Sequence, residues 1–143
     1  KKVLKNGWLH TGDIGTFENG YLKITDRKKD ILITPGGDNI SPVKIENELS
    51  NSKLIDQSVV YGDNKPYLVA LLVLSEDNIG ASNDQIQKEI ENINKNLSKI
   101  ENIKKFFIIN EKFSIENGML TPTLKLKRYK IIQKFKNELE KLY

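Results

Sequence analysis

The run of seven apolar residues from Leu68 to Leu74 restricts the possible folds of this chain more than any other feature. It is far shorter than the ~20 residues that a membrane-spanning helix needs. As a strand it presents apolar side chains on both faces, and such strands lie centrally in sheets covered by helices. We therefore expect a central strand over residues 67–74. A second strand is predicted over Gln57 to Tyr61, before the polar loop at residues 62–66.

Two helices are marked by the residues that begin them. Ser41 and Pro42 are a typical N-cap and first helical residue, which predicts a helix from Pro42 to about Asn51. Ser82 and Gln85 form a capping box for the next helix. The apolar stripe expected to join this helix to the core consists of Ile86, Ile90, Ile93, Leu97 and Ile100.

The last third of the chain predicts one more strand and one more helix. Residues 106–109 complete a three-stranded sheet, and a terminal helix begins at about Arg128. Strands and helices in this order predict an α+β fold, a small three-stranded sheet packed with helices. A β-hairpin precedes it, because Asn19-Gly20 is a strong turn signal between residues 14–17 and 21–25.

The amino-acid composition excludes several classes of protein. The chain has no cysteine and a single histidine, which excludes disulfide scaffolds, thiolate metal sites and histidine-rich metal sites, so no metal site is expected here. No signal peptide is visible. The only methionine is Met119, so we expect this chain to be a piece of a longer protein.

The net charge of +4 is concentrated at one end of the chain. Residues 121–143 carry seven basic residues against two acidic ones. Such a tail is compatible with nucleic acid, an anionic membrane or a phosphorylated small molecule, although a solvated helix face is the more ordinary interpretation. Three tail aromatics lie on or beside the apolar stripe, which favours core packing over base stacking, namely Tyr129, Phe135 and Tyr143.

Three polar segments have no evident packing role. Asp13 follows Thr11-Gly12. Its carboxylate could accept hydrogen bonds from two ribose hydroxyls, or it could form an Asx-turn with the local backbone. Arg27 could bind ribose or phosphate oxygens, and Gly36-Gly37 could admit a ligand close to the backbone. Neither the GxxxxGK[ST] phosphate loop nor the GxGxxG dinucleotide motif is present.

The third polar segment contains Lys125. We predict an extended segment in which Lys125 and Lys127 share one face, while Leu124 and Leu126 share the other. An outstretched lysine suits a carboxylate or phosphate whose charge changes during a reaction. A strand with solvated lysines is an equally good account of the same residues.

Taken in order, these segments resemble the end of an AMP-forming acyl-CoA synthetase, of the adenylate-forming family. The resemblance covers nearly the whole chain, and the segment Leu120-Thr121-Pro122-Thr123 resembles the long-chain fatty acid branch. The matching pieces are residues 7–13, 20–22, 26–30, 36–42, 45–46, 56–63, 66–70 and 121–128.

The resemblance implies a two-domain enzyme, with residues 1–28 ending a large N-terminal adenylation domain and residues 29–143 forming a C-terminal lid. It implies that Asp13 and Arg27 bind the nucleotide and that Lys29 is the hinge. Lys125 would be the catalytic lysine of adenylation, and Gly36 and Gly37 would form the loop facing CoA. Two positions depart from the family, which often has a basic residue near Asp38 and a glycine where this chain has Leu124.

The implied reaction joins a long-chain fatty acid to CoA with ATP, releasing AMP and pyrophosphate. ATP, Mg²⁺ and CoA are therefore the expected cofactors, with the Mg²⁺ and triphosphate sites in the missing domain. The expected partners are the chain's own N-terminal domain, fatty acid and CoA, and no nucleic acid. The expected location is the cytoplasm. Peripheral contact with a membrane is left open. The isolated fragment is expected to be inactive.

Two other functions remain open at this point. One is an adenylate-forming ligase that loads a carrier protein instead of CoA. The other is a non-catalytic basic module that binds nucleic acid or membrane through the tail.

Overall fold

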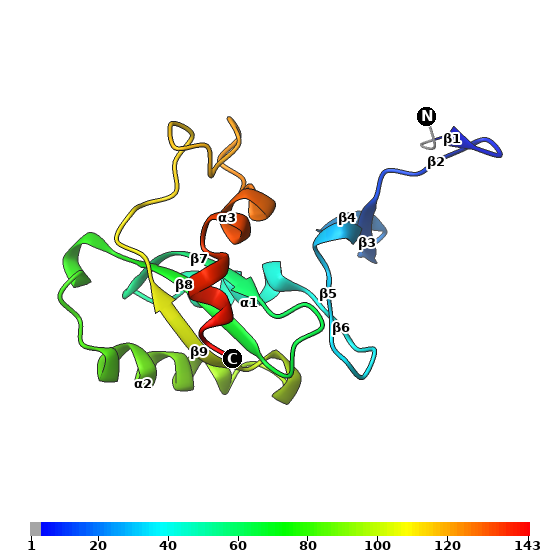
Figure 1. Ribbon diagram of the computed structural model, residues 1–143. Helices are drawn as coiled ribbons and strands as arrows, with labels where there is room; N and C mark the ends of the chain where they lie inside the picture. The colour runs from blue at the N-terminus through cyan, green and yellow to red at the C-terminus, as the bar shows by residue number, and fades with distance from the viewer. Residues whose placement is uncertain (1–3) are drawn as a thin grey trace.

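The body of the protein is a three-stranded sheet between two layers of helices (Figure 1). The computed structural model describes residues 4–143, and of residues 25 and 26 only the backbone. The strand order is β7 (Ile55–Tyr61), β8 (Leu68–Leu74) and β9 (Ile103–Ile108). β7 pairs antiparallel and β9 parallel with β8. Every residue of β8 is buried, which confirms the prediction of a central strand.

The alternating side chains of β8 contribute to two separate cores. Leu68, Ala70, Leu72 and Leu74 pack with α1 (Pro42–Ser50) and α2 (Asn83–Asn94). Val69, Leu71 and Val73 pack on the opposite face with α3 (Arg128–Lys134) and α4 (Lys136–Glu140). Because successive side chains of a strand point to opposite faces, a strand covered on both sides has to be apolar throughout. The predicted α+β class and three-stranded sheet are confirmed.

Both predicted helix starts are confirmed by their caps. The Ser41 hydroxyl accepts a bond from the Lys44 N–H at 3.2 Å. Ser82 and Gln85 bond each other reciprocally at 2.9 and 3.2 Å, as a capping box requires.

Two helices differ from the predictions. α2 ends at Asn94, whose side-chain amide bonds both backbone groups of Ile103 at 2.9 Å. Ile100 therefore leaves the predicted stripe and is 47% exposed in the short 3-10 turn η3 (Lys99–Glu101). The terminal helix is two helices, because the backbone of Phe135 departs from helical geometry (φ −104°, ψ 21°). Tyr129 is 77% exposed, so the prediction that it packs in the core is wrong.

The N-terminal segment projects from the body as two small hairpins (Figure 1). The predicted one joins β3 (Asp13–Glu18) to β4 (Tyr21–Arg27), with positive φ at Asn19 and Gly20. The other hairpin, β1 (Leu4–Lys5) with β2 (Trp8–Leu9), was not predicted, although Asn6-Gly7 carries the same turn signal. A third hairpin, β5 (Leu32–Ile33) with β6 (Asn39–Ile40), connects to α1. The short 3-10 turns η1 (Lys28–Asp30) and η2 (Glu76–Asn78) complete the elements.

No helix within residues 4–143 combines the length and the apolar character that crossing a membrane requires.

Candidate functional site

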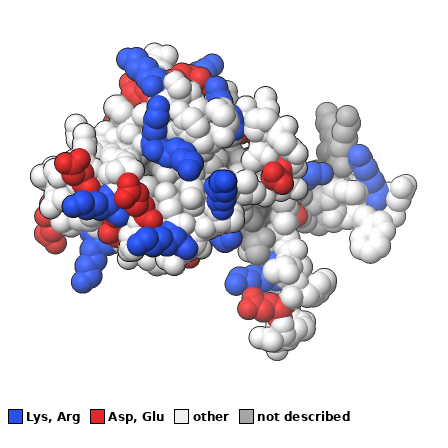
Figure 2. Space-filling view, turned by 90° about the horizontal axis from the view of Figure 1, so that it is seen from below, with Lys and Arg blue, Asp and Glu red and all other residues white. Residues whose placement is uncertain are grey.

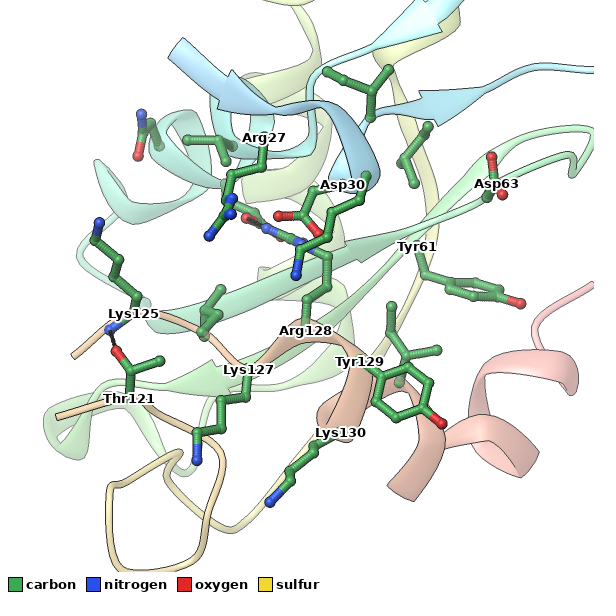
Figure 3. A pocket seen from close by; sticks show the side chains of 18 of the residues that line it. Arg27, Asp30, Tyr61, Asp63, Thr121, Lys125, Lys127, Arg128, Tyr129 and Lys130 are labelled. Atoms are coloured by element: carbon green, nitrogen blue, oxygen red, sulfur yellow. Dashed lines mark hydrogen bonds and ion pairs between the residues drawn. The ribbon is translucent and has the colours of Figure 1, made fainter. Parts of the chain in front are cut away.

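A groove of about 1180 Å³ lies between the end of β4, α1 and the segment that leads into α3 (Figure 3). Three of the predicted site residues line it, namely Arg27, Lys29 and Lys125. Lys127 and Lys130 add two further cations. The structure therefore brings the predicted nucleotide-binding arginine, hinge and catalytic lysine to one cavity whose basic lining suits phosphate and carboxylate groups.

Lys125 lies at the end of a tight turn, which we call the lysine turn (residues 121–125). The Thr121 N–H donates to the Lys125 carbonyl at 2.8 Å, and the Leu124 N–H donates to the Thr121 carbonyl at 2.8 Å. The Lys125 N–H donates to the Thr121 hydroxyl at 3.1 Å. Leu120 and Leu126 close the turn as an isolated antiparallel bridge.

The prediction of an extended segment is therefore wrong at this point. Pro122 and the hydrogen bonds of Thr121 bend the chain back on itself, so the alternation expected of a strand is interrupted. Leu126 still packs against the core, but Leu124 is 69% exposed. The Lys125 side chain is also exposed, and Figure 3 shows it extending from the turn toward the side of the groove that carries Arg27.

The backbone of Leu124 adopts the left-handed conformation, with φ of 63°. This conformation costs an L-residue roughly 1–2 kcal/mol, whereas glycine adopts it freely. We expect Leu124→Gly to raise the free energy of unfolding of the chain by about 1 kcal/mol, measured by denaturant titration. Leu124→Ala keeps the Cβ and is the matched control, with little expected change. A glycine variant no more stable than the alanine variant would contradict this account.

Asp13 and Arg27 are cross-strand partners in the β3–β4 hairpin. The Arg27 Nε lies 3.6 Å from the Asp13 Oδ1, and both side chains retain access to solvent. The hairpin thus holds the two residues predicted to bind the nucleotide side by side. Arg27 lines the groove, while Asp13 lies outside it.

Lys29 occupies the middle of η1, which covalently joins the β3–β4 hairpin to the body. None of the η1 residues is buried. The Lys28 N–H donates a hydrogen bond to the Gly12 carbonyl at 2.7 Å, which ties the start of η1 to the residue before β3. A change of backbone angles here would therefore disrupt no core packing.

Gly36 and Gly37 lie in the exposed loop between β5 and β6. The Gly37 N–H donates to the Thr34 carbonyl at 2.9 Å, and the φ of Gly37 is 89°. The two glycines do not line the groove. Figure 1 shows their loop at one end of the molecule and the lysine turn at another. The structure therefore does not bring the predicted CoA-facing loop together with Lys125.

The groove lining also contains an ion pair that was not predicted, between Glu46 and Arg128. Two guanidinium nitrogens of Arg128 donate to the Glu46 oxygens at 2.5 and 2.7 Å. Glu46 also accepts the Val60 N–H at 2.7 Å. Both charged side chains are only about one-tenth exposed. Because Arg128 begins α3 just after the lysine turn, this pair fastens the turn to α1 and β7.

The signal that could have indicated this pair is local. Glu46 stands between Ile45 and Leu49 on the buried side of a short amphipathic helix, where a carboxylate needs a partner. The sequence did not show which of the many basic residues that partner would be.

Tyr61 also lines the groove and anchors the end of the chain. Its hydroxyl donates to Glu140 at 3.1 Å, and the Lys65 ammonium lies 3.0 Å from the same carboxylate. Burial raises the pKa of Tyr61, and the bond to Glu140 raises it further. Tyr61 therefore remains a neutral hydrogen-bond donor at physiological pH.

The side chains that commonly bind metal ions are not clustered in the described part of the chain. No group of three histidine, cysteine, aspartate or glutamate residues within that part could hold a metal ion. The groove lining is rich in cations, which repel a divalent cation and attract phosphate groups.

Basic side chains on the face shown in Figure 2 are dispersed over the body, with acidic ones among them. Two basic residues of the tail are engaged in ion pairs, Arg128 with Glu46 and Lys134 with Glu111. The Lys134 bond lowers the pKa of Glu111. The basic side chains do not form one continuous patch on this face.

Comparison with protein-family models matches residues 29–143 to the AMP-binding enzyme C-terminal domain. Long-chain-fatty-acid–CoA ligase FadD15 of Mycobacterium tuberculosis is 36% identical over 99% of this chain. Long-chain-fatty-acid–CoA ligase 5 of Mus musculus is 38% identical over 97% of it. The chain spans 27% and 24% of the lengths of these two relatives, respectively.

Solved structures show the same fold. The adenylation domain of a carboxylate reductase from Mycobacterium chelonae superposes with a TM-score of 0.88 at 29% identity, over 99% of this chain and 24% of that one. The O-succinylbenzoate coenzyme A synthetase from Bacillus subtilis, in complex with AMP, superposes with a TM-score of 0.66 at 29% identity, over 89% of this chain and 24% of that one.

Proposed function

Because this chain belongs to the family of AMP-binding enzyme C-terminal domains, we propose that it is the lid of an ATP-dependent long-chain fatty acid–CoA ligase. The whole enzyme would convert fatty acid, ATP and CoA to acyl-CoA, AMP and pyrophosphate through an acyl-adenylate. The observation that carries the proposal is the groove shared by Arg27, Lys29 and Lys125.

In the first half-reaction a carboxylate attacks the α-phosphate of ATP, so two anions have to meet. A cation at their meeting point stabilises the charge that develops there, most strongly where water is excluded. Lys125 would supply this cation, because its exposed side chain extends from a turn whose backbone is hydrogen-bonded. Asp13 and Arg27, held side by side in the hairpin, would bind the ribose and phosphate oxygens.

In the second half-reaction the thiol of CoA attacks the acyl carbon, and Lys125 has to leave the space that the thiol needs. We propose that residues 29–143 swivel about Lys29 while residues 1–28 stay with the large domain. The exposed turn η1 supports this role. The swivel would present the Gly36-Gly37 loop, which lies far from the lysine turn, so one small domain would serve both steps.

The proposed partner of this lid is the N-terminal adenylation domain of the same protein. The projecting hairpins support it, because they expose apolar side chains that normally pack against something. These side chains are Leu4, Trp8, Leu9, Phe17, Tyr21, Leu22 and Ile24, which are 55–80% exposed.

The overall activity can be tested with the full-length protein. A long-chain fatty acid, ATP and CoA should give acyl-CoA and AMP, and omission of CoA should stop the reaction at bound acyl-adenylate. A ligase that loads a carrier protein would make adenylate but no acyl-CoA, and this outcome would replace the proposed acceptor. CoA is favoured because the relatives with 36–38% identity are named as CoA ligases.

Replacing the hinge residue should separate the two steps. We expect Lys29→Pro, which fixes φ at this position, to keep adenylation but slow thioester formation by about tenfold or more. Rapid-quench measurement of each half-reaction in the full-length enzyme provides the test. Lys29→Ala removes the charge while leaving the backbone free, and should retain both steps. Normal turnover of the proline variant would exclude a hinge at Lys29.

A further inference from the structure

The two loops assigned to the two half-reactions adopt the same turn, with the same pattern of hydrogen bonds. The Gly36-Gly37 loop reads Thr-Pro-Gly-Gly-Asp over residues 34–38, and the lysine turn reads Thr-Pro-Thr-Leu-Lys over residues 121–125. Apart from the leading Thr-Pro, the two sequences have no residue in common, and the loops lie at different ends of the molecule (Figure 1).

Three hydrogen bonds recur in both turns. The N–H of the threonine donates to the carbonyl of the fifth residue, at 2.9 Å from Thr34 and 2.8 Å from Thr121. The N–H of the fourth residue donates back to the threonine carbonyl, again at 2.9 and 2.8 Å. The N–H of the fifth residue donates to the threonine hydroxyl, at 3.0 Å for Asp38 and 3.1 Å for Lys125.

The fourth position is left-handed in both turns. Gly37 has φ of 89° and Leu124 has φ of 63°. Glycine takes this conformation without cost, whereas leucine takes it only if the surrounding bonds hold it. In the lysine turn those bonds come largely from Thr121, which bonds the backbone of both Leu124 and Lys125.

The threonine hydroxyl is the part of each turn that a substitution can remove without disturbing the core. Thr34 and Thr121 are each only partly buried, and neither belongs to the two hydrophobic cores. The Lys125 ammonium forms no salt bridge with the described side chains, so the backbone of the turn, which sets where the side chain starts and its initial direction, is the main restraint on it. An error of about 1 Å in such a group can slow a reaction up to about 100-fold.

We propose that Thr121 and Thr34 are positioning residues, one for each half-reaction. This inference rests on the proposed function. Thr121 holds Lys125 in the orientation that adenylation needs, and Thr34 holds the Gly36-Gly37 backbone in the shape that thioester formation needs. Thr121 lines the groove and Thr34 does not, but each acts through the backbone N–H that its hydroxyl accepts, which belongs to Lys125 or Asp38.

The test is a crossed comparison in the full-length enzyme. Thr121→Val, which keeps the shape but loses the hydroxyl, should lower the kcat of adenylation about tenfold with little change in the KM for ATP, and spare thioester formation from supplied acyl-adenylate. Thr34→Val should slow thioester formation from supplied acyl-adenylate and spare adenylation. Thr121→Ser and Thr34→Ser keep the hydroxyl and should restore each step. Equal losses in both half-reactions, or valine variants as active as serine variants, would overturn the proposal.

A second measurement separates this inference from the proposed function. Hydrogen exchange by mass spectrometry on the full-length enzyme should show faster exchange in Thr121→Val only in peptides covering the lysine turn, whatever the reaction. Adding Leu124→Gly, which relieves the left-handed strain, should restore part of that protection and part of the adenylation rate. Unchanged exchange in Thr121→Val would show that the hydroxyl does not hold the turn, and would overturn the inference while leaving the ligase assignment intact.

Discussion

Lys125→Ala in the full-length enzyme is expected to slow adenylate formation by about 10²–10³-fold, the effect typical of removing one group that stabilises developing charge. The same variant should convert supplied acyl-adenylate and CoA to acyl-CoA at a nearly normal rate. The reason is that the lysine would be absent from the site during the second step. Both rates can be measured by rapid quench with labelled fatty acid or adenylate.

Lys104→Ala is a suitable control for this experiment. Lys104 is an exposed lysine on β9 and does not line the groove. Its removal lowers the net charge by the same amount and should change neither half-reaction. If Lys125→Ala slowed both steps equally, the lysine would act in folding or general binding, and its assignment to adenylation would fail.

Arg128→Met is expected to destabilise the protein by about 3–5 kcal/mol, because it leaves the buried Glu46 carboxylate without its cation. Denaturant titration of the 143-residue chain measures this loss as a lower unfolding midpoint. The lysine turn would also lose its attachment to α1, so the full-length variant should be impaired in adenylation as well.

The double variant Glu46→Gln with Arg128→Met tests the cause of this loss. Glutamine keeps an acceptor for the Val60 N–H but carries no charge, so the buried charge disappears with its partner. We expect the double variant to recover about half of the stability that the single variant loses, as a coupled pair should. A loss below about 1 kcal/mol in Arg128→Met would show that the pair does not fasten the turn.

The parts of the fold that sequence predicted well are those fixed by local rules. β8 was predictable because a strand buried on both faces has to be apolar throughout. The starts of α1 and α2 were predictable because capping involves residues only three apart. The bond between Arg128 and Glu46 spans 82 residues, and no local pattern specifies which charges meet over such a distance.

The lysine turn shows how a local hydrogen bond can override a pattern. The alternation of leucine and lysine predicted an extended segment, but Thr121 bonds the backbone of Lys125 and turns the chain. The sequence did contain a usable signal, since Thr-Pro also opens the loop at residues 34–38.

The meeting of Asp13 and Arg27 depends on a detail that the hairpin signal does not contain. Glu18 pairs with Tyr21 beside the turn, and an unbroken register would place Asp13 opposite residue 26. The irregularity between Ile14 and Gly15 shifts the pairing by one residue and brings Asp13 opposite Arg27. Sequence indicated the chemistry of both residues, and only the structure shows that they are neighbours.

The claim that one pivoting lid serves two chemical steps is tested most directly by measuring both half-reactions side by side in Lys125→Ala and Lys29→Pro. A pivoting lid should give a reciprocal result, in which the alanine variant fails to make adenylate but transfers it, and the proline variant makes adenylate but fails to transfer it. Parallel losses of the two rates in both variants would contradict it.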